Sequence, residues 1–254
     1  MERGLLYLRL RKYGTAWADF VRAGTLDPSR PPWERVVRAC SQQLERNPDD
    51  ADAYDARAGA HGRLEQWEAA IDDYGQALRR DPRRPEFLAH RGWTYLRAGQ
   101  KDRAAEDFRR AGEGSAAQAN DLAWDLATAS GEPYRRDPGL AVELAKEAVR
   151  KAPGVAAYWN TLGVAHYRLG EWEAAVRALE ESERLEPGKR VGVNGYFLAM
   201  CHHRLGDPVK ARDHYDRASR WAQENQGTLP VTQQQELKTF HDEARALLNA
   251  CPGP

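Results

Sequence analysis

The sequence predicts an all-α protein built from repeated helical hairpins, and two observations carry that prediction. Ala, Arg, Glu and Leu dominate the 254 residues, and these residue types lose little free energy on entering a helix. Small residues whose neighbouring residues are similar also recur in steps of 20, 34, 34, 37, 34 and 36 residues. A step of about 34 residues is the length of one helix-turn-helix unit. These small residues are Ala16, Val36, Ala70, Ala104, Ala141, Ala175 and Ala211.

The second helix of each hairpin is marked by an apolar stripe at i, i+4 and i+7 from the small residue, which places all three positions on one helix face. At i+4 lie Phe20, Tyr74, Phe108, Leu179 and Tyr215. At i+7 lie Ala23, Ala77, Ala111, Ser182 and Ala218. A proline near the end of this helix stops it, because proline has no backbone N–H. Gly99, Gly170 and Gly206 stand where the first helix turns into the second, since glycine adopts left-handed backbone at little cost.

In these features the sequence resembles the tetratricopeptide repeat (TPR) family, most closely in the stretch Tyr158–Ala175, YWNTLGVAHYRLGEWEAA. The resemblance implies a right-handed α-solenoid over residues 1–250, ended by a C-terminal capping helix. The expected elements are a truncated repeat at 1–28, a lone helix at 31–48, repeats at 51–84, 85–115, 116–153, 156–189 and 192–223, and a capping helix at 232–250.

Three irregularities interrupt this pattern. The first repeat lacks the opening turn of its first helix, as in a piece cut from a longer array or a short natural cap. The 20-residue step leaves room for one helix, from about Pro32 to Arg46, and the prolines before it predict a break in the superhelix there. A long loop at 131–137 is either a functional surface feature or a tolerated insertion.

The expected capping helix carries one apolar stripe, formed by Leu237, Phe240, Ala244 and Leu247. An array needs such a helix because its last repeat otherwise exposes a hydrophobic face. Motifs in the second half, such as Leu122-Ala123-Trp124, also resemble the repeat regions that some bacteria append to Ser/Thr kinases and related regulatory proteins. This narrower resemblance implies a regulatory tail of a larger protein.

The TPR resemblance further implies that the first helices line a concave groove that binds a peptide. The groove residues carried over from the family supply aromatic contacts and arginines that can pair with carboxylates or phosphates. They are Trp93, Arg97, Asn120, Trp124, Asn160, Tyr167, Arg168, Tyr196, Met200 and Arg204.

Composition argues against several other classes of function. Lys plus Arg and Asp plus Glu both number 38, so the zero net charge disfavours binding to nucleic acid or anionic membranes. Three distant cysteines suggest neither disulfides nor a metal site, and a cytoplasmic location fits them. The carboxylates, such as those of Asp72 and Asp73, are expected on solvated faces. We therefore expect no catalytic site, no cofactor and no metal.

The leading prediction is a scaffold that binds a protein or peptide segment in its groove and catalyses no reaction. The alternative is a regulatory or self-associating tail of a bacterial signalling protein such as a Ser/Thr kinase. A helical-repeat RNA binder is less favoured, because Asp52 and Asp55 face the expected groove.

Overall fold

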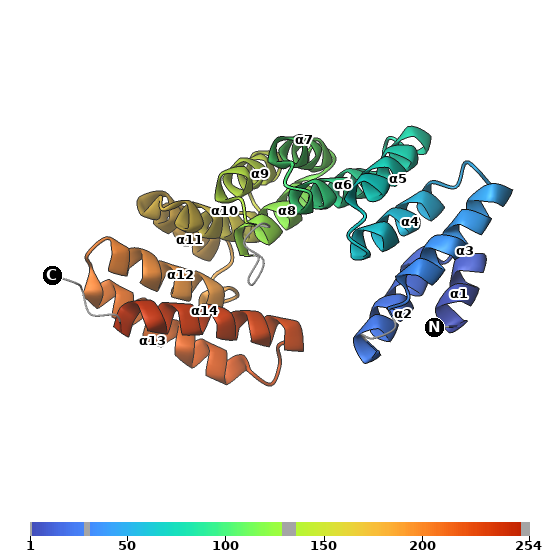
Figure 1. Cartoon of the computed structure of the whole chain (residues 1–254). Coiled ribbons are helices and arrows are strands. Elements are labelled where there is room, and N and C mark those ends of the chain that lie inside the picture. Colours follow the sequence, from blue (N-terminus) through green and yellow to red (C-terminus); the bar gives the residue numbers. More distant parts are fainter. Residues whose placement is uncertain (1, 28–30, 129–135, 250–254) are drawn as a thin grey trace. The chain divides into compact units, whose positions relative to one another are not determined.

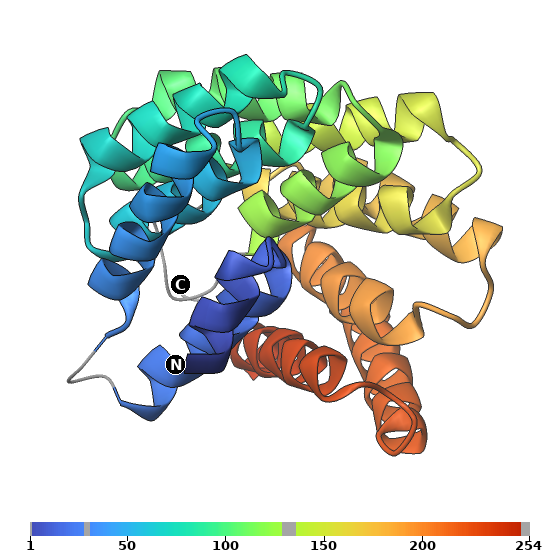
Figure 2. The ribbon, with the colours of Figure 1, turned by 90° about the vertical axis from the view of Figure 1, so that its right-hand side faces the viewer.

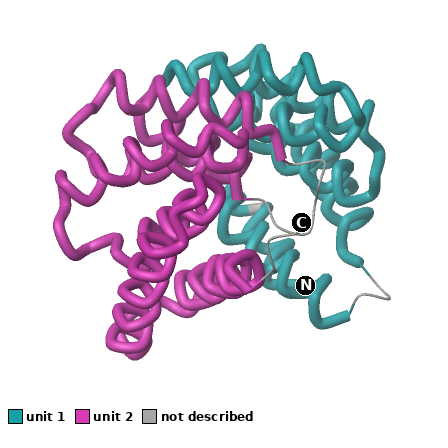
Figure 3. The backbone as a smooth tube through the Cα atoms, turned by 90° about the vertical axis from the view of Figure 1, so that its left-hand side faces the viewer, with its two compact units in different colours: residues 1–114 teal, residues 115–254 magenta. Residues whose placement is uncertain are grey.

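A computed structural model describes residues 2–27, 31–128 and 136–249 of the chain (Figure 1). Within these ranges the protein forms fourteen helices and no strand, which confirms the all-α prediction. The chain divides into two compact units, residues 1–114 and 115–254, shown in two colours in Figure 3. None of the helices in the described ranges is long and apolar enough to cross a membrane.

Unit 1 contains a short N-terminal pair of helices, a single helix and two regular hairpins. In order, these are α1 (Glu2–Arg9), α2 (Tyr13–Leu26), α3 (Trp33–Arg46), α4 (Ala51–Arg63), α5 (Trp67–Arg80), α6 (Pro85–Arg97) and α7 (Lys101–Gly112). Helix α3 packs mainly on α4 and forms no close hairpin with α2, as the 20-residue step predicts. Of the three prolines expected to cause a break there, Pro28 lies outside the described residues.

Unit 2 contains three hairpins and a final helix. In order, its helices are α8 (Ala116–Thr128), α9 (Pro138–Lys151), α10 (Ala156–Leu169), α11 (Trp172–Leu185), α12 (Val191–Arg204), α13 (Pro208–Asn225) and α14 (Val231–Asn249). Most of the 131–137 loop falls outside the described residues, but Asp137 is described and its carboxylate caps α9 by accepting from the Leu140 N–H. Helix α14 lies beside α12 and α13 in two views of the unit (Figures 1 and 2).

Each hairpin is closed by large side chains that fill the space left by small ones. A Cβ atom on Gly163 of α10 would lie 2.5 Å from Leu179 Cγ of α11, so only glycine allows this approach. Gly92 gives the Phe108 ring the same room in unit 1. The turn glycines Gly99, Gly170 and Gly206 have φ angles of +75°, +86° and +78°, which confirms their predicted left-handed conformation.

One prediction about the carboxylates is wrong. Asp73, expected on a solvated face, is 5% exposed, and both of its oxygens accept hydrogen bonds of 2.7 Å from Arg57. Arg91 and Asp107, 34 residues further on, form the same two-bond pair between α6 and α7. A buried carboxylate needs such a partner because desolvation penalises its charge. The equivalent positions in the α10–α11 hairpin hold the buried apolar residues Leu162 and Ala178.

The two units thus allow a direct comparison between an ion pair and a pair of apolar side chains at equivalent repeat positions. We expect Arg57→Leu alone to destabilise unit 1 by about 3 kcal/mol, because the buried carboxylate of Asp73 loses both hydrogen bonds and keeps only His61, whose Nε2 lies 3.8 Å away. Arg57→Leu combined with Asp73→Ala reproduces the Leu162 and Ala178 pair and should recover most of this loss. Urea unfolding of both variants measures the difference, and a double variant no more stable than the single one would contradict the interpretation.

Candidate functional site

The first helices of the three hairpins in unit 2, α8, α10 and α12, lie next to one another and form what we call the inner surface. Helix α14 lies on this surface. It packs more extensively on α12 than on α13, although α13 precedes it in sequence, and its side chains reach α8 and α10. The predicted capping helix therefore forms, but it covers the inner surface of the unit in addition to part of α13.

Three side chains of α14 anchor it to the inner surface, and they stand at i, i+4 and i+7. Glu236 accepts a hydrogen bond of 2.9 Å from the indole Nε1–H of Trp124 on α8. The ring of Phe240 meets the rings of Trp124 and Phe197 edge to face, with centroids 6.1 and 4.9 Å away. Glu243 pairs through both carboxylate oxygens with the guanidinium group of Arg168 on α10. We call Glu236, Phe240 and Glu243 the anchor face of α14.

Arg168 is positioned for this role by the aromatic residues around it. Its guanidinium carbon lies 5.5 Å from the ring centroid of Tyr167 and 5.2 Å from that of Phe197. The arginine side chain is only 12% exposed, so its charge is partly desolvated and its pairing with a carboxylate is stronger than at an open surface. The Nε atom of Arg168 is buried and has no hydrogen-bond partner.

A second contact fixes the middle of α14 against the last hairpin. The Tyr215 hydroxyl is hydrogen-bonded to His241 Nε2 at 2.8 Å, and the two rings stack with centroids 5.5 Å apart. His241 also meets the ring of Tyr196 edge to face. These contacts link α14 to both helices of the last hairpin.

Only a small part of α14 is buried in spite of these contacts. Leu237, Phe240 and Ala244 are the three buried residues among its 19, whereas ten of the 14 residues of α12 are buried. Burying a Phe or Leu side chain contributes roughly 1.5–3 kcal/mol, so the apolar part of the docking free energy is modest.

Cavities lie along both sides of α14. One of about 380 Å³ is bounded by α8, α10 and the first half of α14, and includes Asn120, Asn160 and Arg190. The Oδ1 atom of Asn120 and the Nε atom of Arg190 are buried there without a hydrogen-bond partner. The other, of about 610 Å³, lies between α13 and α14 and reaches Tyr196. The smaller cavity therefore leaves part of the inner surface beside α14 uncovered.

The structure brings together part of the predicted groove. Trp124, Arg168 and Tyr196 contact α14, and Asn120, Trp124 and Asn160 line the smaller cavity. Asn160 also donates a hydrogen bond of 2.6 Å to Asn194 inside the unit. Arg204 is exposed at the end of α12.

The remaining predicted groove residues have other surroundings. Met200 is fully buried and Tyr167 is 9% exposed, so both mainly support the surface from beneath. Trp93 and Arg97 belong to unit 1, where Trp93 packs on the Phe108 ring and the guanidinium of Arg97 lies over the ring of Trp67.

Sequence reasoning missed that α14 itself binds the inner surface. The stripe that includes Phe240 predicts a helix that covers the last repeat, and it does not by itself indicate the inner surface. The two glutamates on either side of this residue, at the same helical face, were the signal that could have pointed to Trp124 and Arg168.

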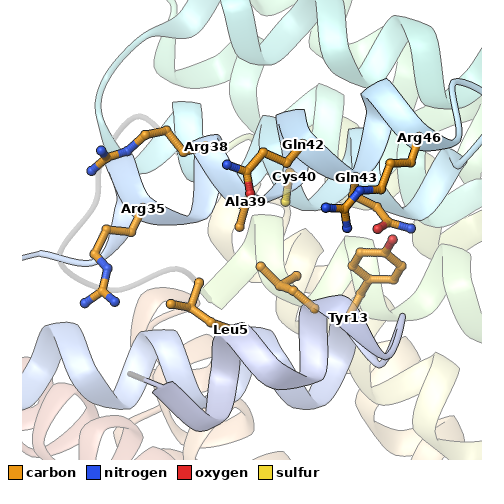
Figure 4. Close-up of a pocket in the computed structure, with 10 residues that line it drawn as sticks. Leu5, Tyr13, Arg35, Arg38, Ala39, Cys40, Gln42, Gln43 and Arg46 are labelled. Carbon is orange, nitrogen blue, oxygen red and sulfur yellow. The ribbon is translucent and has the colours of Figure 1, made fainter.

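Unit 1 has its own cavity, of about 570 Å³, where α3 lacks a close hairpin partner (Figure 4). Leu5, Leu8 and Tyr13 form one wall, and α3 contributes Cys40 and three arginines to the other. None of the predicted groove residues lines it. Within the residues that the structure describes, no group of three or more His, Cys, Asp or Glu side chains could hold a metal ion.

Removing the central ring of the anchor face should release α14. We expect Phe240→Ala to weaken docking by roughly 3 kcal/mol, because the ring is 2% exposed between two aromatic neighbours. The amide hydrogen exchange rates along α14 should then rise by more than about tenfold, whereas those in α10 should stay unchanged. Val231→Ala, at a residue of the same helix that is 68% exposed, is the control and should have no effect. Unchanged exchange in the Phe240 variant would contradict the anchoring role.

Docking should also depend on pH through Glu236. Partial burial raises the pKa of this carboxyl group above its usual 4.5, and nearby Asp125 raises it further, against the opposing effect of the Trp124 hydrogen bond. The docked state thus holds the proton more tightly, so the contribution of Glu236 to docking is greatest at and below pH 4.5 and is lost as pH rises through the raised pKa.

Glu236→Gln keeps an oxygen that accepts from Trp124 but does not titrate. Protection of the α14 amides, corrected for intrinsic exchange rates, should fall in the wild type relative to this variant between pH 4.5 and neutral pH. Parallel pH profiles would show that Glu236 does not control docking.

Comparison with known proteins agrees with the hairpin architecture. Tetratricopeptide repeat profiles match residues 56–119 and 126–189, and a related tetratricopeptide repeat profile matches 195–217. No curated protein matches the sequence significantly. The C-terminal part of a TPR repeat-containing protein from Cytophaga hutchinsonii is similar in structure, with a TM-score of 0.55 at 12% identity, over 99% of this chain and 95% of that one.

Two further solved structures align less well. MamA has a TM-score of 0.48 at 18% identity over 71% of this chain and 96% of its own. YrrB, a TPR protein with an unusual peptide-binding site, has a TM-score of 0.46 at 19% identity over 73% of this chain and 93% of its own. Because the repeat profiles match half of the sequence and coincide with its helical hairpins, the chain belongs to the tetratricopeptide repeat family.

Proposed function

We propose that this protein is an interaction scaffold and that the inner surface of unit 2 is where it binds a segment of another protein. The TPR fold supports a role in protein interaction in general. The observation that favours this particular surface is that side chains from three successive hairpins converge on a single helix, α14. A surface that can hold one helix by an N–H donor, an aromatic pocket and a guanidinium group is suited to hold another.

The chemistry of the surface favours recognition over catalysis. Aromatic residues and arginine are the residue types that dominate protein interfaces, and Trp124, Phe197 and Arg168 supply them here. Asn120 and Arg190 contribute buried polar atoms that a ligand could satisfy in the adjoining cavity. We therefore propose a non-catalytic function for the inner surface.

The wider setting of the chain stays a prediction. A regulatory tail of a bacterial Ser/Thr kinase, a self-associating module and a cytoplasmic location all rest on the sequence. We disfavour an RNA-binding function, because Arg168, the arginine of the inner surface that contacts α14, is paired with a carboxylate.

Affinity capture with two opposite variants tests the proposed surface. Phe240→Ala opens the inner surface and keeps Arg168, so a bound protein should be captured in larger amount than by the wild type. Arg168→Glu also releases α14 but replaces the cation with a carboxylate, so capture of the same protein should be lost. Arg184→Glu, at an exposed arginine of α11, is the matched control and should behave as the wild type.

The proteins captured by each variant are compared by quantitative mass spectrometry. A set of captured proteins that is the same for all three variants would mean that binding uses another surface.

A further inference from the structure

We propose that the partner of the inner surface presents an amphipathic helix with an oxygen acceptor, an aromatic ring and a carboxylate at i, i+4 and i+7, and that α14 is its intramolecular competitor. The proposal rests on the function proposed above and names the chemistry of the ligand. It goes beyond a general peptide groove because each of the three groups is specified by named side chains of the surface.

The donor and the cation of the surface select an oxygen acceptor at the first position and a carboxylate at the third. The Trp124 indole offers a single N–H, which requires an acceptor and is met by Glu236. The Arg168 guanidinium offers two parallel N–H groups, which fit the two oxygens of one carboxylate, as in its contact with Glu243. A ligand lacking either acceptor leaves a partly buried donor unpaired, which costs about 1–3 kcal/mol.

The pocket between these two groups selects an aromatic ring. Trp124 and Phe197 both present ring faces or edges to Phe240, with interplanar angles of 87° and 63°. Such edge-to-face pairs contribute about 0.5–1.5 kcal/mol beyond the burial of area, so an aliphatic side chain of similar size is a weaker occupant. The three positions fall on one face of a helix, and only a helical ligand presents that spacing.

The attachment of α14 is suited to competition. Only three of its 19 residues are buried, and cavities of about 380 and 610 Å³ lie along its sides, so an incoming helix can begin to bind before α14 has left. The five residues 226–230 join α14 to α13 and keep it close to the surface. A short tether gives α14 an effective concentration on the order of millimolar, against which a separate partner has to compete.

This competition sets the expected size of the effect. If α14 occupies the surface about 99% of the time, the apparent affinity of a separate helix is reduced by about 100-fold. Releasing α14 should therefore tighten binding of an external helix, even though the contacts of that helix are unchanged.

Fluorescence anisotropy with a labelled peptide of residues 231–249 tests the proposal on the full chain. Wild-type protein should bind it weakly, and Phe240→Ala protein should bind it at least about tenfold more tightly. Where Phe240→Ala fails to fold, judged by circular dichroism, Glu243→Lys serves as the releasing variant. A peptide of the same composition, with the anchor residues moved off one face, is the ligand control and should bind neither protein.

A charge exchange between protein and peptide distinguishes specific recognition from non-specific binding. Protein carrying Phe240→Ala and Arg168→Glu should lose binding of the natural peptide by at least about tenfold and recover it with a peptide carrying Glu243→Arg. Protein carrying Phe240→Ala and Arg184→Glu should keep the original preference. Equal binding of the natural, rearranged and charge-exchanged peptides would overturn the proposal.

Two further outcomes separate the inference from the proposed function. If capture of a partner depends on Arg168 but these peptides do not bind, the proposed function stands and the inference about ligand chemistry fails. If neither partner capture nor peptide binding depends on Arg168, the proposed function and the inference both fail. If the wild-type chain forms a dimer that the peptide dissociates, a second copy exchanges α14, and the proposal of a distinct partner is overturned.

Discussion

A helical hairpin cannot cover both of its apolar flanks, and this constraint governs the structure described here. Within each unit, successive hairpins cover one another, and residues such as Gly163 make the approach close enough for side chains such as Leu179 to fill the gap. At the end of unit 2 no further hairpin follows among the described residues. The apolar stripe of α14 is buried against the inner surface instead, so the same requirement that builds the stack also places a helix where a ligand would bind.

The two units meet the constraint with different chemistry. In unit 1, Arg57 and Asp73 tie the helices of a hairpin by a partly buried ion pair, and the same arrangement recurs 34 residues later. In unit 2, Leu162 and Ala178 occupy the equivalent positions of the α10–α11 hairpin. A charged contact is found instead at the inner surface, where Arg168 pairs with Glu243. A charge used to hold a hairpin together is unavailable for binding, whereas one held at the inner surface can recognise another chain.

The sequence was sufficient for the hairpins because their signals are local. Small residues at a fixed period, left-handed glycines such as Gly170 and terminal prolines each act within one repeat. The burial of Asp73 was missed although Arg57 precedes it by the same 16 residues that separate Arg91 from Asp107. The docking of α14 could not be predicted from such local signals, because Glu236 and Trp124 are 112 residues apart in the sequence. The position of α14 also depends on the turn that follows α13. Trp124 and Arg168, which the sequence assigns to the groove, contact α14 on the inner surface, whereas the burial of Met200 depends on packing that periodicity does not specify.

The central claim is that the Phe240 ring of the free protein lies in the aromatic pocket of the inner surface. Nuclear Overhauser effects between the Phe240 ring and the Trp124 indole, measured in dilute full-length protein, test it most directly. We expect cross-peaks from Phe240 to both Trp124 and Phe197, unchanged on dilution. A Phe240 ring with the shifts of a solvent-exposed side chain and no contact to either residue would contradict this account.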